Sequence, residues 1–154
     1  MEELQVPTHR VAVEIYTHSG EQFSGGLFVT EAPYHTDRVE DLKQVLNDQR
    51  MFLPFDADEH ATNCHIVNKS HVTRIRLEGR PEDLLVEGAE ARPEGKACQL
   101  RLIDGTAIEG EVAVDTPWSL SRLVDKFNQA EQFVLVVTQD SVEFVQLRHV
   151  ICVN

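Results

Sequence analysis

Residues 20–25 read GEQFSG and residues 105–110 read GTAIEG, so a pair of glycines with four residues between them occurs in each half of the chain. Each half ends with a strand-like run that contains His-Val, at residues 71–72 and 149–150. Such self-similarity is the signature of an internal repeat. Three further landmarks recur with a constant spacing of 81 residues: Leu42 with Leu123, Asn47 with Asn128, and Phe52 with Phe133. The sequence therefore predicts one structural unit that occurs twice.

The repeat divides the chain into two predicted units and a linker. Of the 154 residues, 42% are apolar and 6% are aromatic, which is ordinary for a globular protein. The predicted units span residues 8–78 and 96–154, and the acidic segment 79–95 between them contains the prolines and glycines that are typical of a linker. Units of roughly 70 to 80 residues bury only a small core, so we expect each to pack against its copy or against another subunit.

One apolar patch interrupts the linker. Leu84, Leu85 and Val86 stand together among acidic residues, prolines and glycines. Exposure of this patch to water would be costly in an otherwise polar stretch. We therefore expect it to dock on one of the two units, and the alternative is that it is left for a partner.

The charge distribution disfavours nucleic acid and anionic membranes as partners. The net charge is -12, with 8 basic and 13 acidic residues in 1–80 and 6 and 13 in 81–154, so neither half hides a basic surface. Binding to phosphate backbones depends on clustered Lys and Arg. No apolar run approaches the ~20 residues that span a bilayer, and the N-terminal sequence MEELQVPTHR lacks the apolar centre of a signal peptide. We expect a cytoplasmic protein.

Alternating apolar residues predict paired strands in each half. The first half alternates from residue 10 to 29 around a polar turn, and the second half does so around Asp104-Gly105, a strong hairpin signal. Gly25 and Gly110 fall inside the second strand of each hairpin, where glycine marks a bulge or a sharp bend. Further strands are predicted at residues 51–55, 65–77, 132–138 and 142–153. Because the bends recur at matched positions, the pattern favours two strongly curved small barrels.

A short helix is predicted after each hairpin. One follows a cap at Asp37 and the other begins at Thr116-Pro117. Asn47 and Asn128 are predicted to end the helices, because asparagine tolerates the left-handed backbone found there. Each helix carries an apolar stripe that we expect to cover the open end of a barrel: Val39, Leu42, Val45 and Leu46 in the first, and Leu120, Leu123, Val124 and Phe127 in the second. The predicted fold class is mainly β with short helices.

The sequence contains no recognisable catalytic constellation. No nucleophile elbow, phosphate-binding loop or zinc-ligand spacing occurs, so we expect no enzyme activity, no metal and no cofactor. The odd set Cys64, Cys98 and Cys152 is predicted to be reduced and partly buried. His71 and His149 are the histidines that recur between the halves. They are interpreted as structural imidazoles that bridge elements by hydrogen bonds, with ligand binding as the alternative.

The segment NKSHVTRI at residues 68–75, together with the strand, glycine and strand at 11–29, resembles the Sm-like small-barrel proteins. These include the bacterial RNA chaperone whose closing motif is Lys-His before an apolar strand, and the wider SH3-like barrels share a short polar turn at this place. The chain differs in placing its helix after the second strand and in lacking a basic surface. The resemblance implies internally duplicated SH3-like or Sm-like barrels, with RNA binding as a possible activity.

A more specific resemblance is to a group of uncharacterised bacterial proteins. In that group a strand hairpin leads to an Arg-x-x-Asp-Leu-x-x-x-Leu-Asn helix and then to a Phe-Leu-Pro strand. The matching residues here are Arg38, Asp41, Leu42, Leu46, Asn47, Phe52, Leu53 and Pro54. The second half keeps only Arg122, Leu123, Phe127, Asn128 and Phe133 of this motif. This resemblance implies a small β-barrel fold and offers no activity to carry over.

Three functions follow from these patterns. The leading hypothesis is a non-enzymatic protein-interaction or assembly module, which binds a protein partner or a second copy through exposed sheet edges. The second is an Sm-like RNA-binding protein. The third is a small-ligand sensor, with a pocket between the two barrels and polar contacts from the four residues His71, His149, Lys69 and Arg148.

Overall fold

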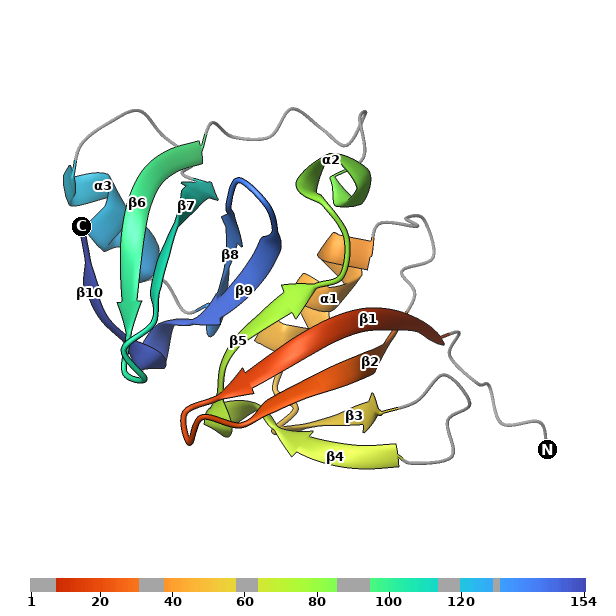
Figure 1. The fold of residues 1–154 in the computed structure, drawn as a ribbon. Helices are drawn as coiled ribbons and strands as arrows, with labels where there is room; N and C mark the ends of the chain where they lie inside the picture. The colour runs from red at the N-terminus through yellow and green to blue at the C-terminus, as the bar shows by residue number, and fades with distance from the viewer. Residues whose placement is uncertain (1–7, 31–37, 58–63, 86–94, 114–119, 129–130) are drawn as a thin grey trace.

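The computed structural model describes residues 8–30, 38–57, 64–85, 95–113, 120–128 and 131–154. The first half contains β1 (Thr8–Thr17), β2 (Gln22–Thr30), α1 (Arg38–Asn47), β3 (Phe52–Asp56), β4 (Cys64–Asn68), the 3-10 turn η1 (Lys69–His71), β5 (Val72–Leu77) and the short helix α2 (Pro81–Leu84). The second half contains β6 (Gly95–Leu102), β7 (Ala107–Ala113), α3 (Leu120–Phe127), β8 (Phe133–Val137), β9 (Val142–Gln146), the 3-10 turn η2 (Leu147–His149) and β10 (Val150–Val153). Figure 1 shows these elements along the chain. The predicted class, mainly β with short helices, is confirmed.

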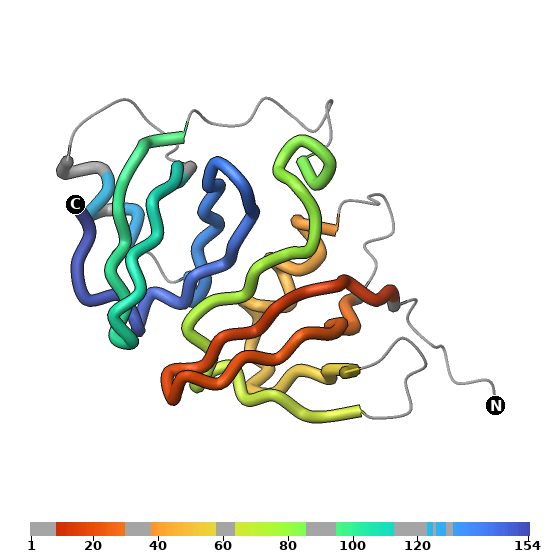
Figure 2. Tube along the Cα trace, viewed as in Figure 1, coloured from red at the N-terminus to blue at the C-terminus, as the bar shows by residue number. Residues whose placement is uncertain are grey.

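The ten strands formed by the described residues belong to one antiparallel sheet. Their order is β10-β6-β7-β8-β9-β5-β1-β2-β3-β4, and within the described residues the sheet does not close on itself. Two small barrels were predicted, whereas the described strands form one open sheet in which β5 of the first half pairs with β9 of the second. That pairing satisfies backbone groups that would otherwise remain at two exposed edges. Figure 2 shows the resulting path, with the last strand and β4 at opposite ends of the sheet.

The paired glycines of the two hairpins occupy equivalent places. Gly20 and Gly105 lie in the turns with φ of 87° and 88°, a left-handed backbone that favours glycine. Gly25 and Gly110 lie where β2 meets β3 and where β7 meets β8. A Cβ atom at Gly25 would lie 2.1 Å from the carbonyl oxygen of Asp56, and one at Gly110 would lie 2.7 Å from that of Val137. Glycine at these two positions therefore permits a close approach of the neighbouring backbone.

Two apolar cores lie along the sheet, and the first core draws on both halves. It consists of residues from β1, β2, α1, β3 and β5 together with Phe133, Val142 and Phe144 from β8 and β9. The predicted stripe of α1 is buried in it, as expected. Leu84 and Leu85 pack against the same core, which confirms the predicted docking, whereas Val86 lies outside the described residues.

The second core is smaller and less completely covered. It contains Leu123 of α3 and residues from β6 to β9, while Phe127 is only partly buried against it. Val124, predicted to belong to the same stripe, is 56% exposed. The predicted helix caps Asp37 and Thr116-Pro117 lie outside the described residues. No helix in the described part of the chain is long and apolar enough to cross a membrane.

Candidate functional site

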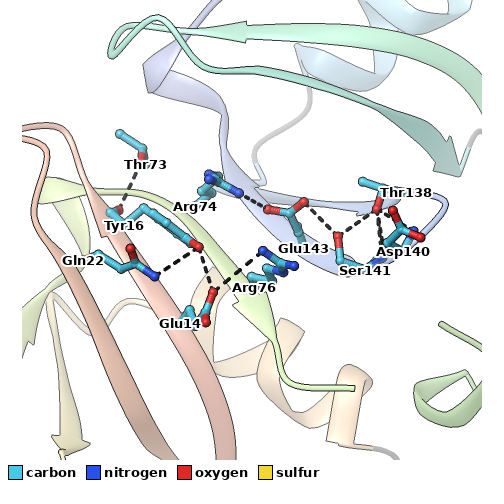
Figure 3. A network of polar contacts seen from close by, with 10 residues as sticks. All are labelled: Glu14, Tyr16, Gln22, Thr73, Arg74, Arg76, Thr138, Asp140, Ser141 and Glu143. Carbon is cyan, nitrogen blue, oxygen red and sulfur yellow. Dashed lines mark hydrogen bonds and ion pairs between the residues drawn. The ribbon is translucent and has the colours of Figure 1, made fainter. Parts of the chain in front are cut away.

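The two halves meet where β5 pairs with β9, and we name this contact the internal junction. The paired residues are Arg74 with Val145, Ile75 with Phe144, and Arg76 with Glu143. The Arg74 guanidinium donates a hydrogen bond to the Glu143 carboxylate, and the two side chains are 15% and 6% exposed. Figure 3 shows these side chains pointing toward one another across the two strands. A paired charge at this depth favours one register of the two strands, because a shift of register would leave a largely buried ion without its partner.

Aromatic and hydroxyl groups extend the internal junction on both sides. The Arg74 guanidinium lies 3.8 Å from the centre of the Tyr16 ring, a cation–π contact. The Ser141 hydroxyl donates to Oε2 of Glu143 over 3.0 Å. The Tyr16 hydroxyl donates to Oε2 of Glu14 over 2.7 Å. Burial and this hydrogen bond to Glu14 raise the pKa of Tyr16 above 10.0, so the phenol stays neutral near pH 7. The network therefore links β1, β5 and β9 across the internal junction.

Lys69, predicted as a ligand-binding residue, is directed into the structure. Its side chain is 3% exposed, and Nζ donates to the carbonyl oxygen of Val45 over 2.6 Å and to Oδ1 of Asp48 over 2.9 Å. Both acceptors lie at the C-terminal end of α1, where a cation is favourable. Although burial opposes ionisation, the hydrogen bond from Lys69 and one from the Arg50 amide lower the pKa of Asp48 below 3.8. The ammonium of Lys69 therefore stabilises the end of the helix.

The structure brings His71 and His149 together around a third histidine. His18 in the β1–β2 turn shares a hydrogen bond with His71, with 2.6 Å between Nε2 and Nδ1. The His18 ring centre is 4.8 Å from that of His71 and 5.7 Å from that of His149. Nε2 of His149 donates to the carbonyl oxygen of Ser70 over 2.8 Å. The last bond crosses between the halves, as expected for an imidazole that bridges elements.

The fourth predicted residue, Arg148, is exposed on η2. Sequence reasoning missed His18, whose only signal was its place in a polar turn. A cleft of about 600 Å³ lies beside β6, β7 and β8, and one of about 370 Å³ lies beside β1, β2 and β5. Neither cleft is lined by the four predicted ligand residues. Across the described ranges, no group of three His, Cys, Asp or Glu side chains is placed to hold a metal ion.

The outer side of β3 and β4 presents apolar side chains to solvent. Phe52 is 51% exposed and Ile66 is 75% exposed. β4 is the last strand at this end of the sheet, and β10 is the last at the other end. Each of these end strands carries a free cysteine, Cys64 on β4 and Cys152 on β10. The third cysteine, Cys98, is buried, and burial raises the pKa of its thiol.

Comparison of the chain with protein-family models, with curated proteins and with solved structures finds no significant match.

Proposed function

We propose that this chain is a non-enzymatic assembly module that joins proteins by adding a strand to the outer edge of β4. The observation that carries the proposal is the combination of an end strand with an apolar outer face. The sequence of β4, CHIVN, contains no lysine, proline or carboxylate, the residues that commonly protect a sheet edge from pairing. Strand addition would satisfy the edge backbone and cover Phe52 and Ile66 in the same step.

We further propose that the two halves are copies of one small unit of the SH3-like or Sm-like kind. The support comes from backbone hydrogen bonds that recur at matched positions. The amide of His18 donates to His71 O over 3.0 Å, and the amide of Ile103 donates to His149 O over 3.0 Å. Likewise the amide of Lys69 donates to Met51 O over 2.9 Å and that of Leu147 to Gln132 O over 2.8 Å. Matched local bonds of this kind are expected of a duplicated unit.

The geometry favours assembly over the two other functions predicted from sequence. Three of the four residues proposed for a small ligand are engaged in contacts within the protein: Lys69 with the end of α1, His71 with His18, and His149 with Ser70. RNA binding would need a surface that offsets a net charge of -12. A cytoplasmic location, which we also propose, would keep the three thiols reduced.

The native cysteines supply the test. A maleimide is applied to a gentle extract of the native host and to the purified chain at nanomolar concentration, and labelling is quantified at each cysteine by peptide mass spectrometry. We expect Cys64 to react at least about tenfold more slowly in the extract, because a bound strand covers its thiol. A tenfold change in rate corresponds to about 1.4 kcal/mol of protection. Buried Cys98 reports unfolding and should stay unreactive in both samples. Equal rapid labelling of Cys64 in both samples would refute the proposal.

A charge-matched pair of variants separates edge binding from a change in charge. Ile66→Lys places a cation on the exposed face of β4, whereas Gln44→Lys adds the same charge to an exposed position of α1. In the extract, Cys64 should become reactive in Ile66→Lys and remain protected in Gln44→Lys. Equal protection in both variants would mean that the outer face of β4 does not bind the partner.

A further inference from the structure

Building on the proposed function, we infer that the strand added to β4 is β10 of a second copy of this chain, in the register that the internal junction already displays. The element order makes β4 the counterpart of β9, and β10 the counterpart of β5. The spacing between counterparts is 78 residues, as between His71 and His149. Within the chain, β9 already pairs with β5. The two end strands of the sheet, β4 and β10, are the counterparts of β9 and β5.

The outer face of β3 and β4 exposes side chains whose counterparts are buried at the internal junction. Phe133 and Phe144 are fully buried in the first core, and their counterparts Phe52 and Ile66 are 51% and 75% exposed. Val142 is buried in the same core, and its counterpart Cys64 is exposed. A second copy that docks as β5 docks on β9 would cover all three exposed side chains.

The surface next to β10, on which β4 of the second copy would dock, is less buried than its counterpart in the first half. Leu46 of α1 and Ile75 of β5 are fully buried in the core that receives Phe133 and Phe144. Their counterparts are Phe127 and Val153, which are only partly buried against the second core. The second half therefore has the same apolar surface as the first, without the strands that cover it there.

Polar contacts of the internal junction also have counterparts at both ends. Oδ1 of Asn47 accepts the amides of Gln132 and Phe133, each over 2.9 Å, and Nδ2 donates to Phe133 O over 3.2 Å. The counterpart of Asn47 is Asn128, which is exposed at the end of α3. In the inferred contact, the Asn128 amide binds the backbone of Met51 and Phe52 in the second copy.

The histidines fit the same contact. At the internal junction His149 donates to the carbonyl oxygen of Ser70. The counterparts are His71 and Arg148, so His71 of one copy would donate to Arg148 O of the next. This contact gives one structural role to both histidines that recur in the sequence.

At the internal junction, Arg74 lies opposite Val145 and Arg76 lies opposite Glu143. The same register between copies places Cys152 opposite Val67 of the second copy. It also places Asn154 opposite His65 of the second copy. The counterparts of Arg74 and Glu143 are Cys152 and His65, so the contact between copies lacks the buried ion pair. We therefore expect it to dissociate on dilution. Because the two edges differ, the contact is heterologous and generates a ring or a filament rather than a symmetric dimer.

Disulfide trapping tests the register. In the variant Val67→Cys/Cys64→Ser, the introduced thiol lies opposite Cys152 of the next copy, within the 4.4–6.8 Å Cα separation usual for a disulfide. Mild oxidation should give a 67–152 linkage between copies, with covalent species larger than two copies. The matched control is His65→Cys/Cys64→Ser, whose thiol lies on the same face of β4 but opposite residue 154. Linkage at position 65 as efficient as at position 67 would overturn the register.

Labelling of the wild-type chain at increasing concentration tests the partner without any substitution. Purified chain should show joint protection of Cys64 and Cys152 as its concentration rises. Protection of Cys64 alone, with a 67–67 disulfide in the variant, would overturn the contact with β10 in favour of a symmetric dimer. If Cys64 is protected in the host extract but never in the purified chain, the second copy is ruled out as partner while the proposed function stands. Rapid labelling of Cys64 under both conditions would reject the proposed function as well.

Discussion

At the scale of single residues, the buried ammonium of Lys69 makes a structural contact that the sequence did not indicate. It stands in the polar segment NKSH and was predicted, together with His71, His149 and Arg148, to contact a small ligand. The structure directs its Nζ to Val45 O and Asp48 at the end of α1 instead. Nothing in the local sequence encodes this contact, because α1 ends about 20 residues earlier in the chain.

Replacement of Lys69 by methionine tests this structural role. Lys69→Met keeps the apolar stem but leaves Val45 O without the ammonium donor, and loss of one such bond costs about 1–3 kcal/mol. Urea denaturation should show this loss. The control is Arg50→Met, which removes an exposed ion pair to the same Asp48 and should change stability by less than about 1 kcal/mol. Equal losses in the two variants would contradict the assigned role.

The pH dependence of Asp48 gives a second test at this scale. Its folded pKa is depressed below the ordinary value of 3.8 by the contacts from Lys69 and Arg50, which outweigh the opposing effect of burial. Its carboxylate therefore contributes stability that is fully present above pH 3.8 and is lost as the pH falls through the lower folded pKa. In denaturation series, the stability difference between wild type and Asp48→Asn should be constant near neutrality and shrink in acid. A difference that grows toward acid would contradict the direction of the shift.

At the scale of elements, local patterns predicted the hairpins and the stripe of α1. These features depend on residues that are close in sequence, such as the alternation around Asp104-Gly105. The helix α2 was missed because its segment was interpreted from composition as a linker, although Pro81 occupies the first helical turn, where proline is favoured. The strands predicted at residues 65–77 and 142–153 are each divided by a 3-10 turn into two strands, because the two parts of each run pair with different neighbours.

The close approaches at the bends make glycine substitutions informative. Gly25→Ala would place a Cβ atom against the backbone oxygen of Asp56, so β2 and β3 must move apart at a cost of about 1–3 kcal/mol or more. Gly105→Ala meets no neighbouring atom, and its cost is confined to the left-handed backbone, about 1–2 kcal/mol. Thermal denaturation should show the larger loss for Gly25→Ala and broken pairing of β2 with β3 in amide exchange. An equal loss with intact pairing would argue against a steric bend.

At the scale of the whole molecule, the continuous sheet could not be derived from sequence. The pairing of β5 with β9 joins segments about 70 residues apart, and no local pattern specifies which edge meets which. One feature of the sequence did indicate that β9 is covered on both faces. The sequence of β9, VEFVQ, is buried at every position, including Glu143 and Gln146, and strands covered on both faces lack a clean polar alternation. The exposed β4 sequence, CHIVN, has no comparable cover within the described chain.

A double-mutant cycle measures how strongly the internal junction holds the halves together. Glu143→Gln leaves the Arg74 guanidinium partly buried without its carboxylate, and loss of one member of a buried pair costs about 3–5 kcal/mol. Arg74→Met should be similarly costly, and the double variant should lose clearly less than the sum. Additive losses in urea denaturation would show that the two side chains are not coupled.

The mass of the purified chain in solution tests assembly through β4 most directly. Sedimentation equilibrium should show the mass of the wild type and of Gln44→Lys rising with concentration from 17.4 kDa to multiples of it, while Ile66→Lys stays at 17.4 kDa. A wild-type mass of 17.4 kDa at every concentration, or association of Ile66→Lys equal to that of the wild type, would contradict assembly of copies through β4.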